Sequence, residues 1–541
     1  MNRTTLSLLA AATALAAVTG FATLSAPADD GKAPVAATPK LLPVERSSLV
    51  CPAPSVSDLA ETTYTSFTPA GGTSGGSTTG TAELVPSAAA SAGTDSSTGD
   101  DKKSDDKKDD AKQDDAAKDD AAKDDAAKDG DKKAADQKAD APAKAFVGVK
   151  APGTPVSKEA EGADTPALIG TATGSLAPGW TTQQSTVDSV GGSRGLLGLS
   201  CTPPDTDFWF PGASTEKSRQ DYVHLTNPDD SAAVVDVELY GKNGALKSEV
   251  GEGIPVPARS SVPVLLSTLT SEASQDVTVH VSTRTGRVGA AVRVADDTVG
   301  SDWLAASADP AATLVLPGIP EDATDVRLVA FAPGGDDADL KVQLAGADGT
   351  ITPAGSESLH VKSKMTASLD LADVTKGEAG SLILSPSQAG SPTPVVAALR
   401  VVRGKGSDQE IAFIPATGPV TARASVADNR AKGTTLSLTA PGAAATVKVV
   451  ASAGSGGGEP AEKTYNVKAG TTLDVTPPVP AGLKGQYALT VEPQSGGPVH
   501  AARMLALPED GVPMFTVQTL PDDRGTVYVP TAKEDLSILG D

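Results

Sequence analysis

A weak repeat constrains this chain more than any other feature, with a period of roughly 100 residues from residue 205 onward. Each unit opens with an apolar segment that ends in proline, and its closing strand carries an Ala-Ala pair. The opening segments are Phe208-Trp209-Phe210-Pro211, Leu314-Val315-Leu316-Pro317 and Ala412-Phe413-Ile414-Pro415. Apolar and polar residues alternate between closely spaced Pro and Gly turns, which predicts antiparallel sheets with one polar face.

The size of each unit indicates the fold class. A unit of about 90 residues with about seven strands matches an immunoglobulin-like β-sandwich, so we expect an all-β chain of tandem sandwich modules. Val527-Tyr528-Val529-Pro530 repeats the opening pattern near the C-terminus. This segment either begins a truncated unit or returns to pair with an earlier one. Because such closure also occurs in β-propellers, a propeller is the alternative fold.

The repeat also predicts the domain boundaries. We expect four β modules and a C-terminal strand segment, at 47–204, 205–298, 312–405, 410–508 and 509–541. The first module fits the repeat loosely and is interrupted at 87–144, where Asp-Asp-Ala-Ala-Lys recurs in register. Asp is a poor helix former and Ala offers no apolar face to bury, which predicts a disordered insertion.

The N-terminus has the pattern of an export signal. Arg3 is followed by an uncharged, Ala/Leu-rich stretch and by Ala26-Pro27-Ala28, so we expect cleavage after Ala28. The alternative is an uncleaved membrane anchor formed by residues 4–28. Residues 29–46 read as a linker. The expected location is the extracellular space or the extracytoplasmic cell envelope.

The cysteine count fits an exported chain. Cys51 and Cys201 are the two cysteines, and an even count outside the cytoplasm favours a disulfide. Cys51 lies on the opening strand of the first module, and Cys201 follows its closing strand. If these strands are neighbours, the bridge clamps the module shut around its insertion.

Charge limits the classes of partner. The net charge of −23 disfavours nucleic acids and anionic lipid surfaces, since both repel an acidic protein. Membrane contact is therefore expected only through an uncleaved N-terminus. The remaining partners are an envelope protein or a polysaccharide.

One segment carries a resemblance. The run from Gly195 to Pro204 (GLLGLSCTPP), the following Phe208-Trp209-Phe210-Pro211-Gly212 and the earlier Val50-Cys51-Pro52 form its most specific part. On these residues, the chain resembles an uncharacterised family of secreted actinobacterial proteins known only as a domain of unknown function. The resemblance runs from about residue 45 to the C-terminus without the Asp/Lys insertion. It implies export and a β-rich body, and it brings no substrate and no catalytic residue.

No catalytic constellation stands out. The histidines are single residues within predicted strands, where we expect them to face solvent: His224, His280, His360 and His500. Ser74 and Ser193 match Gly-x-Ser-x-Gly, but neither is followed by the helix that a nucleophile elbow requires. We therefore predict no catalytic residue and no cofactor.

Two kinds of residue remain as binding candidates. Asp336, Asp337 and Asp339 cluster beside a Gly turn, where they could supply oxygen ligands to calcium. Trp180 follows Pro-Gly in a loop and is the better candidate for an exposed ligand contact. Trp209 lies in Phe-Trp-Phe, which favours a core or module interface over a ligand.

These features predict an exported, non-enzymatic, modular β protein with a binding or scaffolding role. A carbohydrate-active or hydrolytic protein with an unrecognised site is one alternative, and converging carboxylates in a pocket between modules would favour it. A membrane-anchored accessory subunit of an envelope complex is the other.

Overall fold

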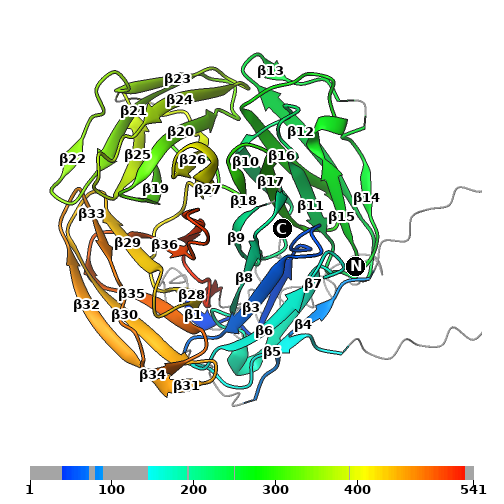
Figure 1. Cartoon of the computed structure of the whole chain (residues 1–541), viewed down its shortest axis with the longest axis vertical. Helices are drawn as coiled ribbons and strands as arrows, with labels where there is room; N and C mark the ends of the chain where they lie inside the picture. Colours follow the sequence, from blue (N-terminus) through cyan, green and yellow to red (C-terminus); the bar gives the residue numbers. More distant parts are fainter. Residues whose placement is uncertain are drawn as a thin grey trace, which may run out of the picture. The chain divides into compact units, whose positions relative to one another are not determined.

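The computed structural model describes residues 39–71, 79–88, 144–191, 194–248, 250–388, 390 and 392–530. Strands dominate this part of the chain, and its only helical elements are single 3-10 turns (Figure 1). Those turns are Gly174–Leu176, Leu266–Thr268 and Gly406–Asp408. No described helix has the length and apolar character needed to cross a bilayer.

Residues 43–525 form one compact unit in which the strands group into four modules. Each module pairs two antiparallel sheets over a common apolar core, and none of the described sheets closes into a barrel. The expectation of an all-β chain built from antiparallel sandwiches is confirmed. A propeller blade, in contrast, is a single four-stranded sheet.

Modules 1 and 2 have the same plan, with the last strand at the edge of the second sheet. In module 1 the first sheet has the strand order β2 (Arg46–Cys51), β7 (Leu168–Thr173), β4 (Ala82–Pro86), β5 (Val147–Gly148). Its second sheet has the order β6 (Val156–Glu161), β3 (Glu61–Phe67), β8 (Thr181–Asp188), β9 (Gly195–Ser200). In module 2 the first sheet has the strand order β10 (Asp207–Ala213), β16 (Val277–Thr285), β12 (Ala233–Gly241), β13 (Gly244–Ala245), and β14 (Ile254–Val256) also pairs with β12. Its second sheet has the order β15 (Ser261–Leu265), β11 (Tyr222–Thr226), β17 (Gly289–Asp296), β18 (Gly300–Leu304).

Modules 3 and 4 repeat this plan. In module 3 the first sheet has the strand order β19 (Leu314–Ile319), β25 (Gly380–Pro386), β21 (Ala338–Ala345), β22 (Thr350–Ile351), and β23 (Ser358–Val361) also pairs with β21. Its second sheet has the order β24 (Thr366–Ala372), β20 (Ala323–Phe331), β26 (Val396–Arg403), β27 (Glu410–Pro415). In module 4 the first sheet has the strand order β28 (Ala424–Asn429), β35 (Tyr487–Gly496), β30 (Ala445–Gly454), β32 (Ala461–Val467). Its second sheet has the order β33 (Thr471–Val475), β29 (Thr434–Ala440), β36 (His500–Ala506), β37 (Phe515–Leu520). The short strands β31 (Gly457–Glu459) and β34 (Ala481–Lys484) form a separate pair.

Two segments differ from the repeat-based expectation. Residues 410–415, predicted to open the last module, form β27 and pair with β26 as the closing strand of module 3. Residues 40–43, predicted as linker, form β1 (Lys40–Pro43), which pairs with β38 (Thr526–Val529) in a separate two-stranded sheet. The C-terminal copy of the opening motif therefore returns to pair with an earlier strand. The predicted signal segment and most of the 87–144 insertion lie outside the described residues.

The last strand of each module, which follows the strand with the Ala-Ala pair in modules 2 to 4, is called its inner strand, and the inner strands contact one another in a closed circuit. β9 contacts β18, β18 contacts β27, β27 contacts β37, and β37 contacts β9. Glycine permits this close approach, since a Cβ on Gly198 of β9 would lie 2.0 Å from Nε2 of Gln518 and 2.4 Å from Cγ2 of Thr516. Module 1 is thereby joined to module 4 as well as to module 2.

Candidate functional site

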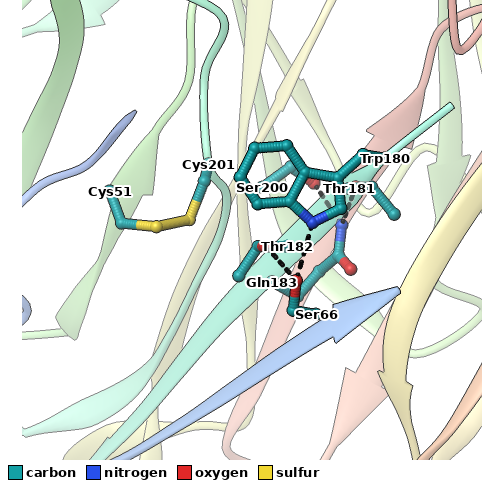
Figure 2. Close-up of a disulfide and its surroundings, with 8 residues drawn as sticks. All are labelled: Cys51, Ser66, Trp180, Thr181, Thr182, Gln183, Ser200 and Cys201. Carbon is teal, nitrogen blue, oxygen red and sulfur yellow. Dashed lines mark hydrogen bonds between the residues drawn. A yellow bond between two sulfur atoms is a disulfide. The ribbon is translucent and has the colours of Figure 1, made fainter. Parts of the chain in front are cut away.

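The predicted disulfide is present and links the two sheets of module 1 (Figure 2). Cys51 ends β2, Cys201 directly follows β9, and their Cα atoms lie 4.6 Å apart. Beside the bridge, Val50 and Thr202 exchange two backbone hydrogen bonds of 2.9 Å. The bridge indicates an extracytoplasmic environment.

Trp180 is buried, which corrects the prediction of an exposed ligand contact. Its side chain is 4% exposed, and its indole Nε1 donates a hydrogen bond of 2.9 Å to Oγ of Ser66 (Figure 2). The residue directly precedes β8, so its ring turns into the module core and away from the loop. Gly170 makes room for it, because a Cβ there would lie 2.5 Å from the indole.

Trp209 fills a module interface, as its surroundings in the sequence suggested, and it is 9% exposed. Its ring stacks on His280 with centroids 3.8 Å apart, and on Phe331 of module 3 at 5.3 Å. Val396 and Tyr240 complete this cluster between modules 2 and 3. Packed against these rings and buried, Trp209 is not available as a contact for a sugar ligand.

The Asp336, Asp337 and Asp339 cluster does not converge on one point. Nδ1 of His360 lies 2.7 Å from Oδ1 of Asp339, its Nε2 lies 3.5 Å from Oδ2 of Asp337, and Asp336 is exposed. In the part of the chain that the structure describes, no group of three or more His, Cys, Asp and Glu side chains could hold a metal ion. Two of the three carboxylates contact the same exposed histidine, so the described arrangement does not support the predicted calcium site.

The histidines all lie in strands, but two of them do not face solvent. His224 and His500 are buried, and burial lowers the pKa of His224 to about 3. Burial also lowers the pKa of His500, whose Nδ1 lies 3.0 Å from the carbonyl oxygen of Thr417. Both rings are neutral core residues near pH 7. Ser74 and Ser193 lie outside the described residues.

A buried carboxyl group joins the inner strands. Asp302 of β18 is fully buried, and it accepts hydrogen bonds from the backbone N–H of Gly198 in β9 and from the hydroxyl of Thr516 in β37. Burial raises its pKa well above the usual range, although these bonds favour the ionised form. With no exposed surface, Asp302 holds strands together and cannot meet a substrate.

Glu410 of β27 is a second buried carboxyl group. Its Oε1 accepts a 3.2 Å bond from the backbone of Leu196 in β9, and burial raises its pKa to about 9. Arg194 binds the same region, donating to the carbonyl oxygens of Ser407 at 3.1 Å and Gln409 at 2.7 Å. These contacts attach module 1 to module 3.

An open polar cavity lies where modules 3 and 4 meet. This junction cleft has a volume of about 290 Å³. Module 3 supplies the turn between β19 and β20 and the end of β26, and module 4 supplies β29, β33 and β36. Its lining includes the side chains of Glu321, Asp322, Arg403, Ser437, Asp474 and Met504.

The carboxylates of the junction cleft differ in their partners. Asp322 is neutralised by Arg403, whose Nε and Nη2 each donate a 2.7 Å bond to it. Asp474 accepts a 2.5 Å bond from the hydroxyl of Ser437, and desolvation by the surrounding protein and the nearby charge of Glu321 raise its pKa. Among the described residues, no ion pair links Glu321 or Asp474 to a cation. The carboxylates of Glu321 and Asp474 can therefore still accept hydrogen bonds, and they lie beside the Asp322–Arg403 pair, whose charges cancel.

Sequence reasoning missed this cleft because its residues share no motif. Glu321 and Asp474 lie in different units of the repeat, each beside a turn that makes an acidic residue unremarkable. The signal that could have found them is position: the β19–β20 turn of one module faces the second sheet of the next. The cavity is lined by carboxylates of both modules.

Residues 156–478 match a family described as a family of unknown function, DUF5719. The match runs from β6 in module 1 to the residues that follow β33 in module 4, and it covers more than half of the 541 residues. No curated protein matches the chain. The chain therefore belongs to DUF5719, a family of unknown function.

Proposed function

We propose that this protein is exported and serves as a non-enzymatic binding scaffold of the cell envelope or extracellular space, with an envelope protein or a polysaccharide as partner. The closed circuit of inner strands carries the proposal. Asp302 of module 2 accepts hydrogen bonds from inner strands of modules 1 and 4, and such contacts hold modules in one body, as a rigid binding platform requires. The buried disulfide supports action outside the cytoplasm.

Export is tested by the intact mass of the protein recovered from culture fluid and from membranes, with and without reductant. We expect a soluble species that begins at Asp29 and becomes heavier by one pair of hydrogens on reduction. A membrane-bound species that keeps Met1 would contradict cleavage and favour the anchored accessory subunit.

Binding is tested by sedimenting the purified mature protein with cell envelopes of the producing organism. We expect saturable co-sedimentation that protease treatment of the envelopes abolishes if the partner is a protein, and that survives if it is a polysaccharide. Absence of saturable binding in both samples would contradict the scaffold proposal.

A carbohydrate-active protein is the second candidate, and the junction cleft favours it. Asp474 has a raised pKa and lies near Glu321, the pairing of an acid with a carboxylate that glycoside hydrolysis uses. The measurement is release of reducing ends from envelope polysaccharide. Release by the wild type that Asp474→Asn abolishes would support catalysis, and no release by the wild type would leave the cleft as a binding site.

A further inference from the structure

A buried group of hydroxyls joins modules 3 and 4 beside Gly318, which lines the junction cleft. The backbone N–H of Gly318 donates a 3.3 Å bond to Oγ of Ser381, which lies 2.7 Å from Oγ1 of Thr439 and 3.0 Å from Oγ1 of Thr472. The three hydroxyl groups are buried. Gly318 has a φ of +90°, and a Cβ there would lie 2.9 Å from Cβ of Ala502. These contacts fix how modules 3 and 4 pack against each other beside the cleft. The cavity is therefore preformed.

The polar groups in the junction cleft are unequally satisfied. Arg403 and Asp322 neutralise each other, and Ser437 donates to Oδ1 of Asp474. In the described structure this leaves Oδ2 of Asp474 and the carboxylate of Glu321 without a donor. A ligand that completes the site must therefore bring hydrogen-bond donors, and an anion would be repelled.

The other residues that line the cleft and its volume indicate the ligand's size, and they indicate that it has an apolar face as well as polar groups. Pro320, Val475 and Met504 contribute apolar surface, and Thr435 and Thr476 contribute hydroxyl groups. A cavity of about 290 Å³ lies just below the range of roughly 300–1,000 Å³ that small-molecule sites occupy. A single sugar ring fits this description, with hydroxyl donors at its edge and an apolar face.

We propose that the junction cleft binds one sugar unit that carries an ammonium group, with Glu321 and Asp474 accepting its charged and hydroxyl donors and Met504 beneath its apolar face. This inference rests on the proposed binding function and names the ligand class of the scaffold. A lysine side chain also brings an ammonium group. It would leave the hydroxyl groups of Thr435 and Thr476 and the Asp322–Arg403 pair without a role, so the lining favours the sugar.

The test is calorimetric titration of the mature protein with a glucosamine oligomer, with the N-acetylglucosamine oligomer as the uncharged comparison. We expect the glucosamine oligomer to bind at least about tenfold more tightly, as expected for a charged hydrogen bond. Glu321→Gln and Asp474→Asn should each weaken its binding by about tenfold, and together abolish it. Asp348→Asn, in the exposed turn before β22, is the matched control and should leave binding unchanged.

Several results would overturn the assignment. They are equal binding of the two oligomers, full binding by the double variant, and binding of a lysine-rich peptide in the absence of sugar binding. Because Glu321 and Asp474 are exposed, an unchanged thermal unfolding midpoint is expected for each variant and separates lost binding from lost folding. A double variant that still co-sediments with envelopes would overturn the cleft assignment and leave the scaffold proposal standing.

Discussion

The junction between modules 2 and 3 differs in kind from the junction between modules 4 and 1. The first centres on large rings, where Trp209 stacks between His280 and Phe331. The second centres on small side chains, Ala427 and Ala488 around Phe67. Its directional contact is the buried amide of Gln183, whose Oε1 accepts the backbone N–H of Ala427 (the Gln183 side chain appears in Figure 2).

Chain connectivity explains this difference. Modules 2 and 3 follow each other directly along the chain, so the linker already limits their relative position, and their rings pack beside polar contacts such as the Arg327–Asp276 ion pair. Modules 4 and 1 are far apart in sequence, and the alignment of their strands must come from contacts that work in one register only. Buried hydrogen bonds have that property, because a misplaced donor remains unpaired and costs free energy.

Removing the large ring of the 2–3 junction should have the largest effect. We expect Trp209→Ala to lower the free energy of unfolding by about 3–5 kcal/mol, the range for deleting a buried aromatic ring. Urea unfolding followed by circular dichroism measures it. Trp180→Ala is the matched control, since it removes an equally buried indole within module 1 and leaves the 2–3 junction intact. A loss below about 1 kcal/mol for Trp209→Ala would contradict a ring-centred junction.

Removing the directional contact of the 4–1 junction should cost less. Gln183→Met keeps the approximate volume and deletes the amide, which leaves the Ala427 N–H unpaired and should cost about 1–3 kcal/mol. Gln494→Met on the exposed end of β35 is the control and should stay within about 0.5 kcal/mol of the wild type. Equal values for the two variants would show that the Gln183 bond does not stabilise the closure.

The polar attachment of module 1 should also respond to pH. Glu410 has a folded-state pKa of about 9 against 4.5 unfolded, so the folded state keeps a proton that the unfolded chain releases. Its contribution is complete below pH 4.5 and is lost as the pH rises toward 9. The slope should reach at most about 1.4 kcal/mol per pH unit.

Unfolding titrations of wild type and Glu410→Gln across this window test that slope. The variant has no proton to release, so its stability should fall less steeply with pH than that of the wild type. Parallel curves for the two proteins would contradict a protonated, buried Glu410.

The repeat predicted the strands well and their partners poorly. Period-two alternation and Pro turns located β10, β19 and the Ala-Ala closing pairs, because one buried sheet face requires that pattern. The segment at 410–415 was placed in the wrong module, since its apolar residues followed by proline look like the opening segments of modules 2 and 3. Only the pairing with β26 separates the two assignments.

The candidate site lay almost wholly beyond the sequence. Cys51 and Cys201 were predicted because an even cysteine count has few outcomes. Trp180 was misplaced because a Pro-Gly turn reports the backbone and not the direction of the next side chain. The junction cleft depends on how two modules pack, which no local pattern around Glu321 or Asp474 encodes.

The central claim is that the inner strands of all four modules form one cooperative unit joined at Asp302. Hydrogen exchange of backbone amides, read by mass spectrometry in the wild type and in Asp302→Asn, tests it most directly. We predict that β9, β27 and β37 exchange faster in the variant together with β18, because the four strands open as one. Faster exchange confined to β18 would contradict this account and show that the modules open independently.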